Sequence, residues 1–126
     1  ILDIDDFKNI NDTFGHPLGD IVLIKIANTL KAAFPEDAVI GRLGGDEFGI
    51  FLPADPGREQ MELYMKILYE RISAFRFRED TSVDVSFSVG IALTKGKNFA
   101  GFYKAADAAL YVSKQGGKNR FSFYDE

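Results

Sequence analysis

A glycine-containing turn between two apolar runs places the tightest limit on how this chain can fold. Residues 38–40 and 48–52 are apolar, and the turn 42–48 between them reads Arg-Leu-Gly-Gly-Asp-Glu-Phe. Short apolar runs rich in β-branched and aromatic residues around such a turn predict a β-hairpin. Gly44 and Gly45 permit positive φ and let another group approach the backbone closely.

Two carboxylates, Asp46 and Glu47, follow the glycines, although a hairpin does not need them. One interpretation is a solvated acidic turn. Residues 1–5 suggest another, because they alternate apolar and acidic residues and would place Asp3 and Asp5 on one face of a strand. If that strand ends beside the hairpin tip, Asp3 comes close to Asp46 and Glu47. A bound cation would offset the repulsion between these three carboxylates.

Composition limits the kinds of site that this chain can contain. It has 126 residues, which suits one domain, and 46% are hydrophobic, which argues against disorder. It has no cysteine and a single histidine, His16, so a metal must be held by oxygen, which favours Mg²⁺, Mn²⁺ or Ca²⁺. A net charge of −4 without a long basic run argues against duplex DNA binding. No apolar stretch reaches membrane-spanning length, and no signal peptide is visible.

The remaining patterns predict an α+β fold with a central antiparallel-rich sheet flanked by helices. The predicted elements are a strand over 1–5, one or two helical turns over 7–12, a helix over 18–34, hairpin strands over 38–43 and 48–52, a helix over 58–75, an exposed polar stretch over 76–82, a strand over 83–93, a helix over 99–114 and a strand over 121–124. The order is β-α-β-β-α-β-α-β.

Three details of these elements can be tested. The helix over 18–34 has only a narrow polar stripe, so we expect it to be buried over most of its circumference, with Pro17 and Asp20 in its first turn. Small residues should let the helix over 99–114 lie close to the sheet; they are Ala105, Ala106, Ala108 and Ala109. Gly116-Gly117 should cap that helix.

The residues themselves suggest chemistry on phosphates. Mg²⁺ takes one or two protein carboxylates, and substrate phosphates complete its shell. Gly44 and Gly45 leave room for a phosphate or a base, while Lys114 and Lys118 flank a turn and can reach phosphates as point charges. The alternative for both lysines is a favourable charge at a helix C-terminus. Together with the acids, this pattern indicates a metal-dependent nucleotidyl transfer site.

Six segments, in order along nearly the whole chain, resemble the GGDEF family, the diguanylate cyclases. They are residues 2–12 (Leu-Asp-Ile-Asp-Asp-Phe-Lys-Asn-Ile-Asn-Asp), 15–20 (Gly-His-Pro-Leu-Gly-Asp), 42–48, 88–92 (Ser-Val-Gly-Ile-Ala), 106–111 (Ala-Asp-Ala-Ala-Leu-Tyr) and 114–119 (Lys-Gln-Gly-Gly-Lys-Asn). The resemblance implies a fold related to the palm of polymerases and to the class III nucleotide cyclases. It also implies condensation of two GTP molecules into cyclic di-GMP with release of pyrophosphate.

The resemblance assigns roles to residues. Asp3 and Asp46 would bind Mg²⁺ or Mn²⁺ with the Ile4 carbonyl, and Glu47 would be a further ligand. Asp46 or Glu47 would be the general base. The substrate-binding groups would be Asn11 and Asp20 at guanine, the backbone N–H groups of Phe7 and Lys8 at the phosphates, Gly44 and Gly45 beside the nucleotide, and Lys114 and Lys118 at the phosphate tail. Asp20 also suits a helix N-terminus, and we expect His16 and Asp107 to be structural.

The chain also departs from the family pattern. The product-inhibition motif Arg-x-x-Asp would fall at positions 35 and 38, which are Pro35 and Ala38, so we expect that site to be absent. In the family, arginine is common at the position of Lys118. Lysine cannot form the bidentate contact with a phosphate that arginine forms. The helix that usually precedes the first strand is missing. We therefore expect residues 1–126 to be a single catalytic domain cut from a longer protein, cytoplasmic or the cytoplasmic part of a membrane-bound sensor.

One site holds one GTP, so the active form should be a homodimer arranged by an upstream sensor or regulatory domain, without nucleic acid or membrane contact. Two alternatives to an active cyclase remain. One is a catalytically silent GTP-binding or dimerisation module that regulates an attached domain. The other is a related cyclase with a different nucleotide choice.

Overall fold

The computed structural model describes residues 1–73, 83–93 and 98–125. The elements of this part of the chain are, in order, β1 (Leu2–Ile4), α1 (Phe7–Phe14), α2 (His16–Ala33), β2 (Val39–Arg42), β3 (Glu47–Phe51), α3 (Arg58–Ser73), β4 (Phe87–Ile91), α4 (Phe99–Gln115) and β5 (Phe121–Phe123). None of the helices described is long and apolar enough to cross a membrane.

The strands form one mixed sheet in the order β2-β3-β1-β4-β5. β1 pairs antiparallel with β3 and with β4, and β2 pairs antiparallel with β3 as the predicted hairpin. β5 runs parallel to β4, because α4 crosses over between these two strands. The predicted α+β fold with an antiparallel-rich sheet flanked by helices is confirmed.

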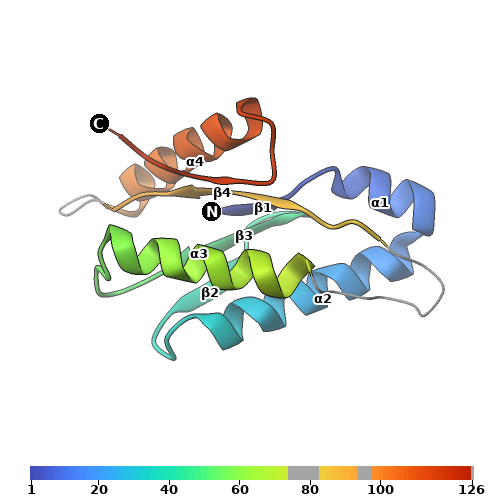
Figure 1. Cartoon of the computed structure of the whole chain (residues 1–126), viewed down its shortest axis with the longest axis horizontal. Helices are drawn as coiled ribbons and strands as arrows, with labels where there is room; N and C mark the ends of the chain where they lie inside the picture. Colours follow the sequence, from blue (N-terminus) through green and yellow to red (C-terminus); the bar gives the residue numbers. More distant parts are fainter. Residues whose placement is uncertain (74–82, 94–97, 126) are drawn as a thin grey trace.

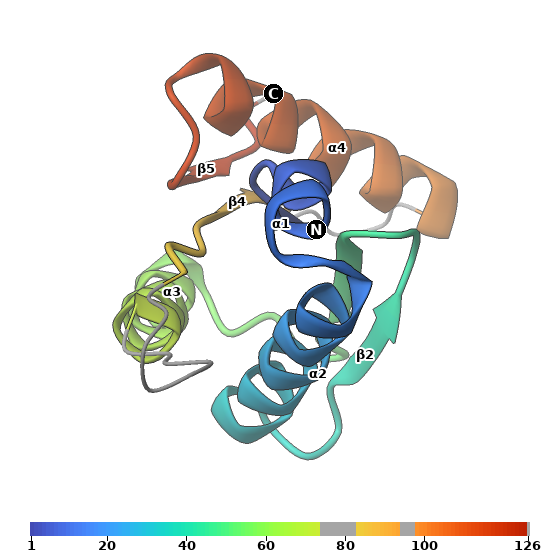
Figure 2. The same ribbon diagram turned by 90° about the vertical axis from the view of Figure 1, so that its right-hand side faces the viewer.

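Helices cover both faces of the sheet (Figure 1). α4 lies on one face, and α2 and α3 pack together on the other, as the perpendicular view in Figure 2 also shows. The main core fills the second space, where Leu2 and Ile4 of β1 meet apolar side chains of α2 and α3. Burying one such side chain stabilises the fold by about 1.5–3 kcal/mol.

Close contact between α4 and β4 depends on small side chains. A Cβ on Gly90 would overlap the backbone of Ala106 and Leu110, so the helix can approach the strand only because this residue is glycine. Ala105, Ala106 and Ala109 are buried at the contact, as predicted, whereas Ala108 is exposed. The Ser113 hydroxyl fixes the far end of the helix by donating to the Val89 carbonyl at 2.8 Å.

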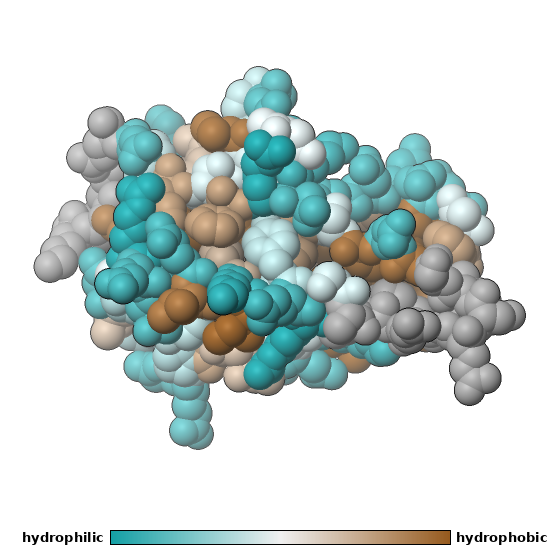
Figure 3. Space-filling model, in the orientation of Figure 1, coloured by the Kyte–Doolittle hydropathy of each residue, from teal (hydrophilic) through white to brown (hydrophobic). Residues whose placement is uncertain are grey.

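Helix α2 differs from its prediction at its start and on its outer face. It begins at His16, so Pro17 lies in the first turn as expected, but Asp20 lies beyond it and the first turn holds no acid. Ile21 and Ile24 are 40% and 60% exposed, so less of the helix is buried than predicted. On the molecular face in Figure 3, apolar and polar residues are interspersed, and isolated exposed apolar residues are ordinary on folded proteins.

The remaining boundaries are close to the predicted ones. The strand predicted over 83–93 is shorter, and all five residues of β4 are buried because α4 covers its second face. α3 ends at Ser73 among the described residues, so the last two positions of the predicted helix and the predicted polar stretch 76–82 lie outside them. Gly117 has φ +115° after α4, consistent with the predicted glycine cap.

Candidate functional site

The turn between β2 and β3 is held by backbone hydrogen bonds and by Arg42. The Leu43 N–H donates to the Glu47 carbonyl at 2.8 Å. The Arg42 guanidinium donates to the carbonyls of Gly44 and Gly45 at 3.0 and 2.8 Å. A Cβ on either glycine would meet nothing within 4 Å. Neither glycine has positive φ, so they contribute open space at the tip and not the left-handed backbone that the sequence allowed.

Strand β1 places Asp3 beside this tip. The register aligns Asp3 with Glu47, and the Ile4 N–H donates to the Asp46 carbonyl at 3.0 Å. Residues directly opposite one another in antiparallel strands point to the same face with Cβ atoms about 4.5–5.5 Å apart. The expected approach of the first strand to the hairpin tip is therefore confirmed.

The electrostatic surroundings of Asp3 are unfavourable for its charge. Its side chain is 21% exposed. Burial raises the pKa of Asp3 to about 6, the Lys114 ammonium opposes the rise, and the charges of Asp46 and Glu47 add to it. A cation close to these three acids would offset both the burial and the repulsion.

The carboxylates of Asp3, Asp46 and Glu47 are suitable ligands for a divalent cation, but they are not arranged as a complete metal site. Within the described residues, no three His, Cys, Asp or Glu side chains are grouped so that they could hold a metal ion. Glu47 Oε1 accepts a hydrogen bond from the Tyr103 hydroxyl at 3.1 Å, and Lys114 Nζ lies 3.5 Å from Asp3 Oδ1. Carboxylate oxygens are the ligands that Mg²⁺ prefers. The metal role of these residues stays a prediction, and the hydrogen bond from Tyr103 leaves the second oxygen of Glu47 for an ion.

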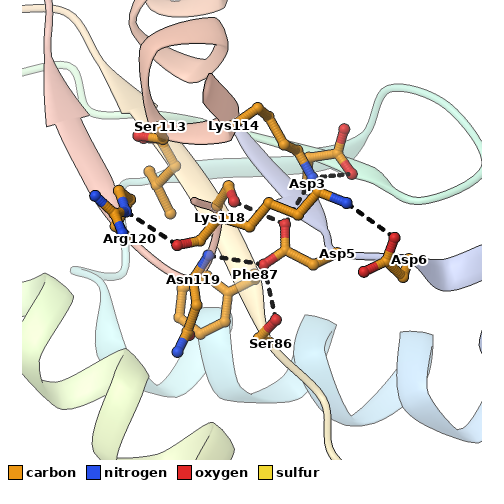
Figure 4. A network of polar contacts seen from close by, with 12 residues as sticks. Asp3, Asp5, Asp6, Ser86, Phe87, Ser113, Lys114, Lys118, Asn119 and Arg120 are labelled. Atoms are coloured by element: carbon orange, nitrogen blue, oxygen red, sulfur yellow. Dashed lines mark hydrogen bonds and ion pairs between the residues drawn. The ribbon is translucent and has the colours of Figure 1, made fainter. Parts of the chain in front are cut away.

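Asp5 occupies the centre of the polar network shown in Figure 4. It is 5% exposed and accepts hydrogen bonds from two serines, one lysine and one backbone N–H. Burial alone would raise its pKa, but the hydrogen bonds from Lys114, Ser88 and Ser86 outweigh burial and lower it. Sequence reasoning assigned no role to Asp5, although the alternation of residues 1–5 placed it on the face of Asp3.

Both predicted phosphate-binding lysines lie against acids at the end of β1. Lys114 Nζ is 2.7 Å from Asp5 Oδ1, and Lys118 Nζ is 2.9 Å from Asp6 Oδ1. Lys118 and Asp6 both have positive φ, at 63° and 52°, and both are exposed enough for their pair to separate. The lysines and the hairpin acids therefore occupy one region, around the end of β1.

Helices α1 and α2 carry the predicted guanine-binding residues. Asn11 packs against Gly19, where a Cβ would overlap its side-chain oxygen, and Asp20 is the next residue along α2 and is exposed. Asn11 Oδ1 is buried without a hydrogen-bond partner among the described residues. Buried polar atoms normally have partners, so an amide in this position is suited to a ligand. Phe7 and Lys8 form the first turn of α1.

A large apolar cavity lies elsewhere. It has a volume of about 600 Å³, and among the described residues its lining is mainly aliphatic and aromatic, including Phe34, Ile50, Met65 and Phe102. None of the predicted metal, catalytic or substrate residues lines it. A cavity of this composition does not suit a triphosphate, so the charged end of β1 remains the candidate site.

Comparison with protein families identifies a match over most of the chain. Residues 1–120 match the family model described as "Diguanylate cyclase, GGDEF domain". The chain is 34% identical over 122 residues to the probable diguanylate cyclase DgcC of Escherichia coli K12, which covers 95% of the chain and 33% of that protein. It is 36% identical over 126 residues to the bifunctional diguanylate cyclase/cyclic di-GMP phosphodiesterase MucR of Pseudomonas aeruginosa, covering 98% of the chain and 18% of that protein.

Solved structures agree with this match. The active GGEEF domain of a diguanylate cyclase from Vibrio cholerae superposes with a TM-score of 0.88 at 33% identity, covering 99% of the chain and 80% of that domain. The chain spans a third or less of the length of the two curated relatives named above. What those whole proteins do is therefore not transferred to this chain by the match alone.

Proposed function

The chain belongs to the GGDEF family of diguanylate cyclase domains, and from that premise we propose that it condenses two GTP molecules into cyclic di-GMP. The observation that carries the proposal is the antiparallel register that sets Asp3 opposite Glu47 beside an open Gly-Gly tip. Acids at this position, next to lysines, suit a metal-bound triphosphate.

In this proposal each group of residues has one task in binding GTP. Asn11 and Asp20 contact the guanine edge, where a carboxylate accepts from N–H groups and an amide both donates and accepts. The first turn of α1 offers the backbone N–H groups of Phe7 and Lys8 to the phosphates, since helix N-termini favour anions. Lys114 neutralises the phosphate tail, assisted by Lys118.

Asp3, Asp46, Glu47 and the Ile4 carbonyl would hold Mg²⁺ or Mn²⁺. When bound, the ion would lower the pKa of the attacking 3′-hydroxyl and stabilise negative charge at the α-phosphate. Asp46 or Glu47 accepts the proton of that hydroxyl, and the lysines stabilise the departing pyrophosphate. Because one site holds one GTP, two copies of the domain must face each other. A longer polypeptide would arrange them as a homodimer.

A second candidate is a silent GTP-binding or dimerisation module. The hydrogen bond from Tyr103 to Glu47 and the contact of Lys114 with Asp3 favour it, because both acids have partners without a metal. Against it, a site without turnover has no need for acids whose charges raise the pKa of Asp3.

One incubation separates these candidates. A protein that includes this domain is mixed with GTP, ATP and Mg²⁺, and the products are identified by mass spectrometry. Cyclic di-GMP supports the proposal, tight GTP binding without product supports the silent module, and an adenine-containing product indicates a different nucleotide choice.

The matched control for the incubation is Asp46→Ala. This substitution removes a partly exposed carboxylate at the hairpin tip and should leave the melting temperature nearly unchanged. Under the proposal turnover falls by at least about 10²-fold, the effect typical of losing one group that acts on the transition state. Activity equal to that of the wild type would contradict the role of Asp46.

A further inference from the structure

The buried carboxylate of Asp5 is fixed at both oxygens. Oδ1 accepts from the Ser88 hydroxyl at 2.7 Å and from Lys114 Nζ at 2.7 Å. Oδ2 accepts from the Ser86 hydroxyl at 2.8 Å and from the Asn119 N–H at 2.9 Å. These donors come from β4 and the residue just before it, from the end of α4 and from the turn before β5, so the carboxylate is held by segments distant in sequence (Figure 4).

Two serines and a backbone N–H already hold this carboxylate in place. Its contact with Lys114 therefore serves to hold the lysine. Lys114 Nζ lies 2.7 Å from Asp5 Oδ1 and 3.5 Å from Asp3 Oδ1. Its ammonium has three N–H donors. The two aspartates take two of these donors, which leaves one donor for an incoming anion.

The second lysine provides a contrast. Lys118 pairs with Asp6, and the two side chains are 44% and 65% exposed. Exposed pairs of this kind contribute little to stability and exchange readily with water. The Asp5 side chain is only 2% exposed, so its pair with Lys114 is far better fixed in space.

We propose that Asp5 is a positioning residue, which holds the Lys114 ammonium beside Asp3 at the place where the nucleotide triphosphate binds. The inference rests on the proposed function. It extends the proposed function by assigning a role to a buried carboxylate that is not among the proposed metal or substrate ligands. Asp5 acts only through Lys114: without the carboxylate, the lysine side chain keeps its charge but loses its fixed position.

A double-mutant cycle tests this pathway. The domain-containing protein is prepared as wild type, Asp5→Asn, Lys114→Met and the double variant. Calorimetry measures binding of a non-hydrolysable GTP analogue and of GMP, which lacks the β- and γ-phosphates. We expect each single substitution to weaken binding of the analogue by about tenfold, which is the scale of one hydrogen bond to a charged group. Binding of GMP should weaken by less than about twofold. In the protein that already carries Lys114→Met, Asp5→Asn should weaken binding of the analogue by less than about a further twofold.

Two further variants separate positioning from stability. Ser88→Ala removes another donor to Asp5 Oδ1 and leaves Lys114 in place, so it should lower the melting temperature without changing the preference for the analogue over GMP. Asp5→Glu keeps the charge but moves it by one methylene. If Asp5→Asn does not fold, the Asp5→Glu variant should still show a loss of the preference for the analogue over GMP.

The possible failures can be told apart. Additive losses from Asp5→Asn and Lys114→Met, or equal losses for the analogue and GMP, would overturn the positioning role and leave the proposed function standing. If the wild type does not prefer the analogue, or if Lys114→Met binds it normally, both the positioning role and the proposed phosphate site are wrong.

Discussion

At Asp3 a mostly buried carboxylate faces two acids and one lysine, and this imbalance of charge characterises the site at the scale of residues. Alternation and the hairpin turn predicted which acids lie at strand ends, and the pairing of β1 with β3 then brings Asp3 to Asp46 and Glu47. The sequence was not sufficient for Asp5 or Tyr103. Asp5 pairs with Ser86, Ser88, Lys114 and Asn119, and Tyr103 pairs with Glu47 on β3. Such contacts between elements distant in sequence leave no local pattern.

Replacing Asp3 should change how stability depends on pH. The pKa of Asp3 is raised to about 6 from its ordinary 3.8, so the folded protein holds this proton more tightly than the unfolded chain. The resulting stabilisation is fully present below pH 3.8 and is lost as pH rises through about 6. Without divalent cations, circular dichroism melts from pH 4 to 7 should show the wild type losing Tm relative to Asp3→Asn. Parallel curves would contradict the raised pKa.

The hydrogen bond between Tyr103 and Glu47 gives a second prediction at this scale. The hydrogen bond and the charge of Glu47 raise the pKa of Tyr103. Glu47→Gln removes the charge, so we expect the pKa of Tyr103 to fall toward its ordinary value. NMR titration of ¹³C-labelled tyrosine measures this change. An unchanged titration would mean that the contact does not form in solution.

At the scale of elements, the contact of α4 with β4 determines where the lysines lie. Periodicity predicted the helices and strands because buried residues recur about every 2.0 residues in a strand and every 3.6 residues in a helix. It could not supply the strand order, or the parallel pairing of β5 with β4, since these depend on long-range packing. The length of β4 was overestimated for the same reason: apolar alternation continues through Val83 and Val85, but strand pairing begins at Phe87.

Gly90→Ala tests the close approach of α4. The new Cβ would overlap backbone atoms of Ala106 and Leu110, which cannot rotate away as a flexible side chain can. Overpacking of this kind costs about 1–3 kcal/mol. We expect urea unfolding to show a loss in this range. The matched control is Gly41→Ala on the edge strand β2, where a Cβ meets nothing within 4 Å and stability should change little. Equal losses would contradict the proposed packing.

At the scale of the whole molecule, the proposed domain has one nucleotide site, and the proposed reaction needs two. The chain covers 33% of DgcC and 18% of MucR, so those relatives contain further segments that this chain does not match. The family could be predicted from six ordered segments of sequence, and the comparisons confirm it over residues 1–120. Assembly could not be derived from the chain, because a local sequence pattern does not show how two copies would meet.

Feedback by the product gives a prediction at this scale. The positions expected to hold Arg and Asp are Pro35 and Ala38, which are joined in a tight turn by the Ala38 N–H and the Pro35 carbonyl at 3.0 Å. Neither side chain can grip a phosphate or a guanine. Initial rates of GTP turnover should therefore be unchanged by added cyclic di-GMP. A progressive slowing with added product would show that another surface binds it.

The central claim is that acids from β1 and the hairpin hold a divalent cation together with a triphosphate. Electron paramagnetic resonance of free Mn²⁺, with a non-hydrolysable GTP analogue present, tests it most directly. The matched control is Asp55→Asn, which removes an exposed acid from the loop after β3. We predict that the wild type and the control lower free Mn²⁺ below the level set by the analogue alone and that Asp3→Asn does not. Equal Mn²⁺ binding by Asp3→Asn, or none by the wild type, would contradict the account.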